Sequence, residues 1–212
     1  MNARERVGEA WQELAHQYGW DAVSAQSTLE VLVQAYAEPH RHYHTLTHIA
    51  ELLQLLDEHG DAADRDALTL TVLFHDVIYD PARRDNEAAS AKLAVEMLAP
   101  LGLSGECIAT VERYILATQH NVSPSSDDDT ALHLLLDLDL SVLASPPARY
   151  RAYAQAIRLE YLNVPEDLYC HGRRRVLEGF LARPQIYRTE RLRALWEAPA
   201  RANLAREIAE LT

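Results

Sequence analysis

Residues 64–79 read DRDALTLTVLFHDVIY, and this stretch decides the fold. Leu68, Val72 and Leu73 recur at the spacing of one helix face, and most of their neighbours are apolar as well. We therefore expect a central, buried helix over this stretch. It should end by Pro81, because a proline disfavours helical geometry in the residue before it.

The rest of the chain divides into segments with the same spacing, separated by glycine, proline and polar stretches. Strand-like alternation is scarce, so we predict an all-α fold that forms one domain over 1–212. The polar stretch 121–129 predicts a mobile loop, and Ser145 followed by two prolines predicts a helix start. Further helices are expected at 4–18, 27–36, 47–59, 85–98, 104–120, 147–161, 166–181 and 189–211, the last interrupted at Pro199, and an apolar run covers 132–142.

The net charge of −12 limits the partners that this chain can have. A nucleic-acid-binding surface needs a basic patch, which this charge balance opposes. No apolar run approaches the ~18 residues of a membrane span, and the first residues lack the form of a signal peptide. Cys107 and Cys170 belong to no CxxC pattern, so we expect reduced thiols. These features predict a cytoplasmic protein with no nucleic-acid or membrane partner.

Two stretches place ionisable side chains inside apolar runs. His75 and Asp76 are adjacent within the expected central helix, and Asp137 and Asp139 lie in a run of leucines. Burying such groups is costly unless they are paired or neutralised. Taken singly, each has an ordinary explanation, either as a buried hydrogen-bonded pair or as a helix cap or partner for arginine.

A histidine-rich stretch precedes both of these segments in the sequence. Four of the ten histidines lie between His40 and His48. His44 and His48 share one face if a helix begins by His44. Two or three imidazoles with one or two carboxylates can hold a divalent transition ion and leave positions for water. The three stretches together predict a metal site between central helices, in a core of about 40–145, with C-terminal helices at about 146–212.

The order His, then His-Asp, then Asp on a helical chain resembles the HD superfamily of metal-dependent phosphohydrolases. Over nearly its whole length the chain is similar to a bacterial subfamily of predicted HD phosphohydrolases of about this size. The similar strings are RHYHTLTH at 41–48, FHDVIYD at 74–80, DNE at 85–87, DLDL at 137–140, IRLEY at 157–161, GR at 172–173 and ARANL at 200–204.

This resemblance implies a set of four metal ligands: His48, His75, Asp76 and Asp139. Asp139 is preferred to Asp137 because Asp-Leu-Ser fits the last motif position of the family. The identity of the ion stays open among Mn, Mg, Co, Ni, Zn and Fe, since mixed nitrogen and oxygen ligation suits several of them.

Residues 43–48 are also similar to the Tyr-His-Asn-x-x-His string of cyclic-nucleotide phosphodiesterases, whose first histidine protonates the leaving oxygen. The similarity makes His44 the candidate general acid, with Thr45 in place of the asparagine. Nucleotidase members of the superfamily carry a glutamate shortly after the His-Asp pair. Here Asp80 and Glu87 are the alternative acid–base candidates. Each also has an ordinary structural explanation: Asp80 can start a turn, and Glu87 suits the first turn of a helix.

Contacts to a substrate phosphate are expected from arginine, because Lys92 is the single lysine and guanidinium groups suit bidentate anion contacts. Arg41, Arg158 and Arg173 lie in the family-like strings, and surface ion pairing is the alternative for each. His120, beside the acidic loop, is a candidate contact to substrate or to a second metal ion.

The predicted function is metal-dependent hydrolysis of a phosphate ester of a small molecule, with a nucleotide as the preferred class. A metal-stabilised module that senses a nucleotide without cleaving it is the non-enzymatic alternative. A di-iron oxygenase is a further alternative, although the gap from His120 to His133 is shorter than in those proteins. The oligomeric state stays open, with a homo-oligomer among the options.

Overall fold

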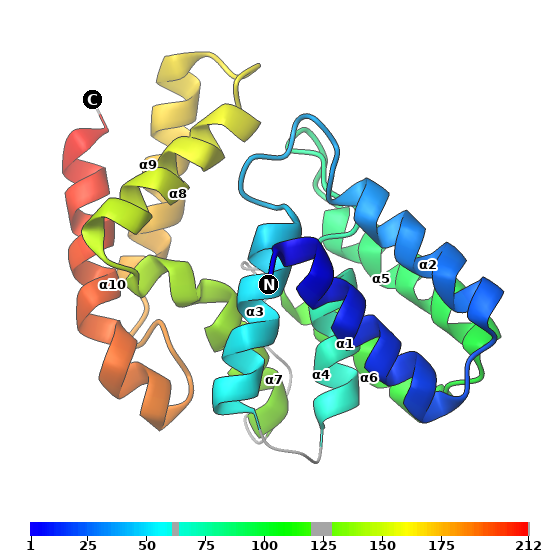
Figure 1. Cartoon of the computed structure of the whole chain (residues 1–212). Coiled ribbons are helices and arrows are strands. Elements are labelled where there is room, and N and C mark those ends of the chain that lie inside the picture. The colour runs from blue at the N-terminus through cyan, green and yellow to red at the C-terminus, as the bar shows by residue number, and fades with distance from the viewer. Residues whose placement is uncertain (61–63, 120–128, 212) are drawn as a thin grey trace. The chain divides into compact units, whose positions relative to one another are not determined.

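All the regular secondary structure among the described residues is helical (Figure 1). The computed structural model describes residues 1–60, 64–119 and 129–211, and within these ranges there is no strand. The prediction of an all-α fold is therefore confirmed. No helix in these ranges is long and apolar enough to cross a membrane. The loop expected at 121–129 lies outside the described residues except for its last position.

The fold divides into two compact units, Met1–Leu135 (unit 1) and Leu136–Thr212 (unit 2). The expectation of one domain over 1–212 stays a prediction. The elements of unit 1 are α1 (Ala3–Tyr18), α2 (Ala22–Ala35), α3 (Leu46–His59), α4 (Arg65–Phe74), α5 (Asn86–Leu98), the 3-10 turn η1 (Ala99–Leu101), α6 (Gly105–Ala117) and the start of α7 (Thr130–Asp139).

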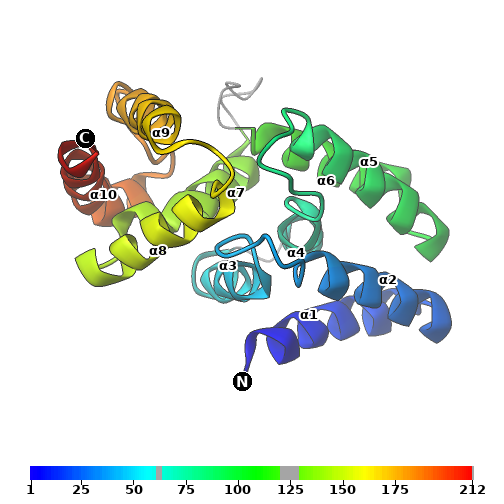
Figure 2. The ribbon, with the colours of Figure 1, turned by 90° about the horizontal axis from the view of Figure 1, so that it is seen from above.

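Helix α4 is the buried centre of unit 1. Every side chain from Leu68 to Phe74 is buried. The helix packs against α1, α3, α5 and α6, and Figure 2 shows it end-on among them. This is the central helix that the apolar stretch 64–79 predicts.

The central helix is nevertheless shorter than predicted, because it ends at Phe74 and not near Tyr79. His75 is its C-cap, and the His75 N–H closes the last helical turn on the Thr71 carbonyl at 2.8 Å. Residues 76–80 form an irregular turn, so the prediction that Asp76 lies inside the helix is wrong. The physical reason is tertiary: side chains from other segments bind the carbonyls of this turn, as described below.

Unit 2 consists of the end of α7, the 3-10 segment η2 (Leu140–Ala144), α8 (Pro147–Glu160), α9 (Glu166–Leu181) and α10 (Glu190–Glu210). Helix α10 packs against η2 and α9. It runs through Pro199 without a break, so the expected interruption there is wrong. Buried Leu192 before the proline and buried Leu204 after it anchor both halves, which outweighs the one hydrogen bond that a proline removes.

Two helix starts also differ from the sequence expectation. Helix α2 begins earlier than residue 27, because the Asp21 carboxylate accepts a hydrogen bond from the Ser24 N–H at 2.9 Å and caps it at Ala22. At the start of α8 the N-cap is Pro146, while Ser145 ends η2.

Candidate metal centre

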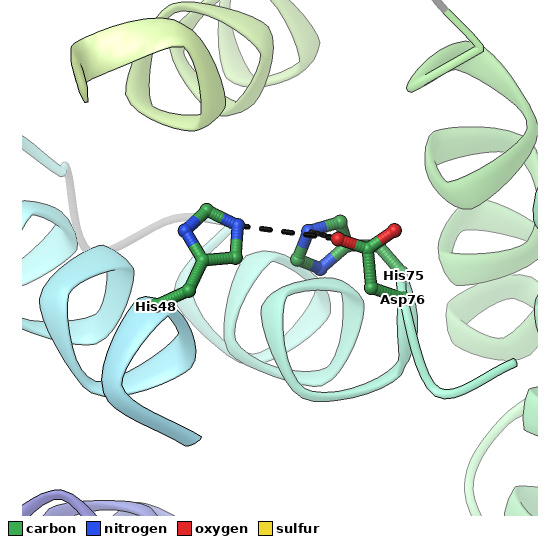
Figure 3. Close-up of side chains that lie close together, drawn as sticks. All are labelled: His48, His75 and Asp76. Atoms are coloured by element: carbon green, nitrogen blue, oxygen red, sulfur yellow. Dashed lines mark ion pairs between the residues drawn. The ribbon is translucent and has the colours of Figure 1, made fainter. Parts of the chain in front are cut away.

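Three of the four expected ligands lie together in unit 1: His48, His75 and Asp76 (Figure 3). One donor atom from each lies within 4.8 Å of the other two. Asp76 Oδ2 is 3.1 Å from His75 Nε2 and 4.0 Å from His48 Nε2. Both imidazole side chains are 3% exposed whereas Asp76 is 19% exposed, so the cluster opens to solvent on its carboxylate side.

His48 is placed by the first turn of α3. The helix buries this residue on the same face as Ile49 and Leu52. Thr45 is the N-cap, and its hydroxyl accepts a hydrogen bond from the Thr47 N–H at 3.3 Å. Asparagine, which the phosphodiesterase string has at this position, is also a good N-cap, so Thr45 keeps a capping side chain.

The hydrogen bonding of His75 fixes which of its ring nitrogens carries a proton. Nδ1 lies 2.9 Å from the Val72 carbonyl oxygen, and since a carbonyl only accepts, Nδ1 is the donor. In a neutral imidazole, Nε2 then carries a lone pair that faces Asp76 Oδ2 at 3.1 Å. Two acceptors at this distance require a cation or a second ring proton between them. A metal ion supplies the cation, and a backbone-bound Nδ1–H is the arrangement usual for histidine ligands.

Asp76 belongs to a turn whose backbone is held by side chains. Each of the five consecutive carbonyls from residue 76 to residue 80 accepts a hydrogen bond from a side chain of another segment. Arg41 binds the carbonyls of Asp76 at 2.7 Å and Val77 at 2.9 Å, Ser90 binds that of Ile78 at 3.2 Å, His40 that of Tyr79 at 2.8 Å and Asn86 that of Asp80 at 2.9 Å. Ser90 also accepts a hydrogen bond from the Ile78 N–H, and Asn86 accepts one from the Asp80 N–H. These bonds replace the helical ladder and fix the direction of the Asp76 side chain.

His44, the candidate general acid, lies beside this cluster. It precedes α3, so the condition for sharing a helix face with His48 is not met, yet its Nε2 is 4.0 Å from Asp76 Oδ2. Its ring stacks on Tyr79 at 4.1 Å between centroids and meets the edge of Tyr43 at 5.1 Å. The side chain is 19% exposed. An imidazole held in this way can donate a proton to a group that approaches the carboxylate side of the cluster.

The two aspartates of the leucine run have different surroundings. The buried Asp137 carboxylate accepts hydrogen bonds from the backbone N–H groups of Arg188 and Thr189, each at 2.7 Å, and from the Thr189 hydroxyl at 2.6 Å. These bonds tie α7 to the residues just before α10, so Asp137 is neither a helix cap nor an arginine side-chain partner but an acceptor for the chain at 188–189. Burial raises the pKa of Asp137, although the three hydrogen bonds act in the opposite direction. Asp139 also belongs to unit 2, and its role as fourth ligand stays a prediction.

The other two acid–base candidates lie on the turn after the cluster and on the following helix. Asp80 is exposed, and its carboxylate accepts a hydrogen bond from the Ala82 N–H at 2.9 Å. Glu87 is half-buried in the first turn of α5. Both positions match the structural roles considered for them, and a catalytic role for either stays a prediction.

The three candidate arginines all make hydrogen bonds within the protein. Arg41 binds backbone carbonyls at the cluster. In unit 2, Arg158 binds Glu166 and two backbone carbonyls, and Arg173 binds Glu207 through two nitrogens at 2.7 and 3.1 Å. Substrate contact by these side chains is untested. His120 lies outside the described residues.

Sequence reasoning did not single out His40, Ser90 or Asn86 for the site. Asn86 stands in one of the family-like strings, and His40 borders another, so both carried a signal that we assigned to their neighbours. Ser90 carried none, because a serine among alanines in a helix is ordinary. All three act through the backbone of residues 76–80.

Comparison with known proteins adds no family to this geometry. No protein-family model matches the chain, and no curated protein matches it. The candidate site therefore rests on the geometry of its own residues.

Proposed function

We propose that His48, His75 and Asp76 hold a divalent metal ion and that the chain is a metal-dependent phosphohydrolase. The observation that carries the proposal is the 3.1 Å distance from His75 Nε2 to a carboxylate oxygen of Asp76, in a ring whose Nδ1 already faces a backbone carbonyl. Two buried imidazoles and one partly exposed carboxylate form a mixed donor set that fits Mn, Mg, Co, Ni, Zn or Fe unequally but excludes none. The substrate class is a small phosphate ester, and a nucleotide is the preferred candidate.

The residues of the site divide the chemical work. A divalent ion, when bound, lowers the pKa of a coordinated water and polarises a phosphoryl oxygen. The exposed edge of Asp76 leaves the ester an approach to the cluster. His44, oriented by the rings of Tyr79 and Tyr43, donates a proton to the leaving oxygen. Asp80 and Glu87 are the alternative donors.

Metal binding is the first test. The purified chain is stripped with chelator and dialysed against each of the six ions, and the bound metal is measured by elemental analysis and calorimetry. We expect binding by the wild-type chain and its loss in Asp76→Asn. Asp85→Asn, which removes an exposed carboxylate paired with Arg83, should bind as the wild type does. Equal affinity in Asp76→Asn and the wild type would reject the ligand assignment.

A screen of phosphorylated metabolites with the bound ion then tests the reaction. Release of phosphate or of a phosphomonoester product supports the hydrolase. Stabilisation by a nucleotide without any product supports the sensing module instead. Two irons per chain with oxygen consumption would support the oxygenase.

A further inference from the structure

Arg41 contacts both segments that form the candidate metal centre. Its Nη1 donates to the carbonyl of Asp76 at 2.7 Å and to that of His44 at 3.4 Å. Its Nη2 donates to the Val77 carbonyl at 2.9 Å, and its Nε to the Glu38 carboxylate at 2.9 Å. One guanidinium thus joins the segment before α3 to the turn after α4.

The surroundings of Arg41 hold the guanidinium in one orientation. Its side chain is 0% exposed, although its carboxylate partner Glu38 is 45% exposed. The charged group lies 5.2 Å from the ring centre of Tyr36 and 5.5 Å from that of Tyr79. Burying a cation is costly unless its donors are used, and here each nitrogen of the planar fork donates to an oxygen. An arginine that binds a substrate phosphate would instead need solvent exposure and N–H groups that are not already used within the protein.

We infer that Arg41 is a positioning residue of the candidate centre, which sets the geometry of Asp76 and His44 by binding their backbone carbonyls. The sequence pattern pointed instead to contact with substrate. The Tyr79 ring that flanks Arg41 also stacks on His44. The guanidinium therefore influences the proposed acid in two ways, through the His44 carbonyl and through the Tyr79 ring. The inference rests on the proposed function, since it concerns the same site.

The test measures metal affinity and the spectrum of the bound metal, not activity. In Arg41→Lys a single ammonium replaces the planar fork and cannot reach the three carbonyls together. We expect Co²⁺ affinity to fall by about 10- to 100-fold, the usual range for losing an outer contact of a metal site. The visible absorption spectrum of bound Co²⁺ should change with it. In Arg41→Ala, added methylguanidinium should restore much of the affinity and the wild-type spectrum.

Arg201 provides a matched control in unit 2. Its guanidinium also binds one carboxylate, that of Glu197, and three backbone carbonyls, those of Leu181, Arg183 and Pro184. Arg201→Lys therefore removes the same kind of clamp, but from carbonyls at 181–184, none of which belongs to a candidate ligand. Its Co²⁺ affinity should stay within about twofold of the wild type, well inside the range expected for an outer contact of the site.

The outcomes distinguish failure of the positioning role of Arg41 from failure of the proposed function. Wild-type affinity and spectrum in folded Arg41→Lys would overturn the positioning role and leave the proposed function standing. Absence of Co²⁺ binding by the wild-type chain would reject the proposed function itself. If the Arg41 variants do not fold, Glu38→Ala removes the exposed partner and keeps the guanidinium. We then expect a smaller affinity loss with an altered spectrum, and an unchanged spectrum would overturn the inference.

Discussion

Unit 2 buries the carboxylates of Asp137 and Glu207 whereas Asp76 of unit 1 is partly exposed, and the two units surround these groups with different chemistry. In unit 2 the Glu207 carboxylate accepts hydrogen bonds from Arg173 and from the Tyr150 hydroxyl, and Asp137 accepts three from the backbone and side chain at 188–189. In unit 1 the neighbours of Asp76 Oδ2 are imidazole nitrogens, one of which is oriented as an acceptor. Burial of an acidic group is therefore not what indicates a metal site. A metal site is indicated by the balance of hydrogen-bond donors and acceptors around the carboxylate.

The largest expected effect is on the chemistry assigned to unit 1. His44→Ala should slow hydrolysis of an alkyl phosphate ester by about 10²- to 10⁴-fold, because the leaving alkoxide loses its acid. The loss should be much smaller for a nitrophenyl ester, whose leaving group departs without protonation. Metal affinity should be unchanged. Steady-state rates with the two ester types give the comparison.

His16→Ala is the control for this variant, because His16 is an exposed histidine in the last turn of α1. It should leave both rates unchanged. An equal loss for the two esters in His44→Ala would contradict the acid assignment and turn attention to Asp80 and Glu87.

The next largest effect is on the stability of unit 2. Glu207→Ala leaves Arg173 and Tyr150 buried without their carboxylate, and should cost about 3–5 kcal/mol of unfolding free energy. Urea denaturation followed by circular dichroism measures it. Glu210→Ala, an exposed position one turn later on α10, should stay within about 0.5 kcal/mol of the wild type. Similar values for the two variants would mean that this network contributes little.

Metal should stabilise the chain through Asp76 and not through Asp137 or Glu207, the buried carboxylates of unit 2 that hydrogen bonds already satisfy. With free metal at about 100 times its dissociation constant, we expect about 2.7 kcal/mol of added stability. The gain should vanish in Asp76→Asn and persist in Asp85→Asn. A gain that survives in Asp76→Asn would place the binding elsewhere.

Hydrogen exchange with and without metal extends this test to the fourth ligand. Peptides that cover the start of α3 and residues 75–80 should gain protection when metal binds. If Asp139 completes the set, the peptide at the end of α7 should gain protection as well. Protection confined to unit 1 would leave the ion with three ligands from this chain.

Local sequence pattern predicted most of the helices, and the resemblance implied the three residues that cluster, but neither indicated how Asp76 is held. The run from Leu68 to Phe74 is apolar except for two threonines, and such a segment has few alternatives to a buried helix. The point where α4 ends was missed, because the hydrogen bonds that replace its ladder come from His40, Arg41, Asn86 and Ser90. Those contacts exist only after the chain has folded.

The two aspartates of the leucine run show the same limit. Both fit a pattern of acidic residues in an apolar segment, and only the resemblance separated them. The structure explains Asp137 by a partner at 188–189 that no local rule could supply. Arg41 binds backbone carbonyls at the candidate centre, and its role as a substrate contact stays a prediction. A guanidinium that binds backbone carbonyls and one that binds phosphate look alike in sequence.

The smallest expected effect is a pH dependence that separates Asp137 from the other carboxylates. Burial raises the pKa of Asp137 in the folded chain, so the folded state holds its proton to higher pH than the unfolded state does. Its contribution to stability is therefore complete below the unfolded pKa, near 4, and declines as pH rises through the folded pKa. Asp129 has a lowered pKa and contributes the opposite slope, so the wild-type curve alone cannot isolate Asp137. Subtracting the stability of Asp137→Asn at each pH removes the shared slopes, whatever constant cost the substitution carries. The difference should fall with rising pH across this window, and a rising difference would show that its three hydrogen bonds outweigh burial.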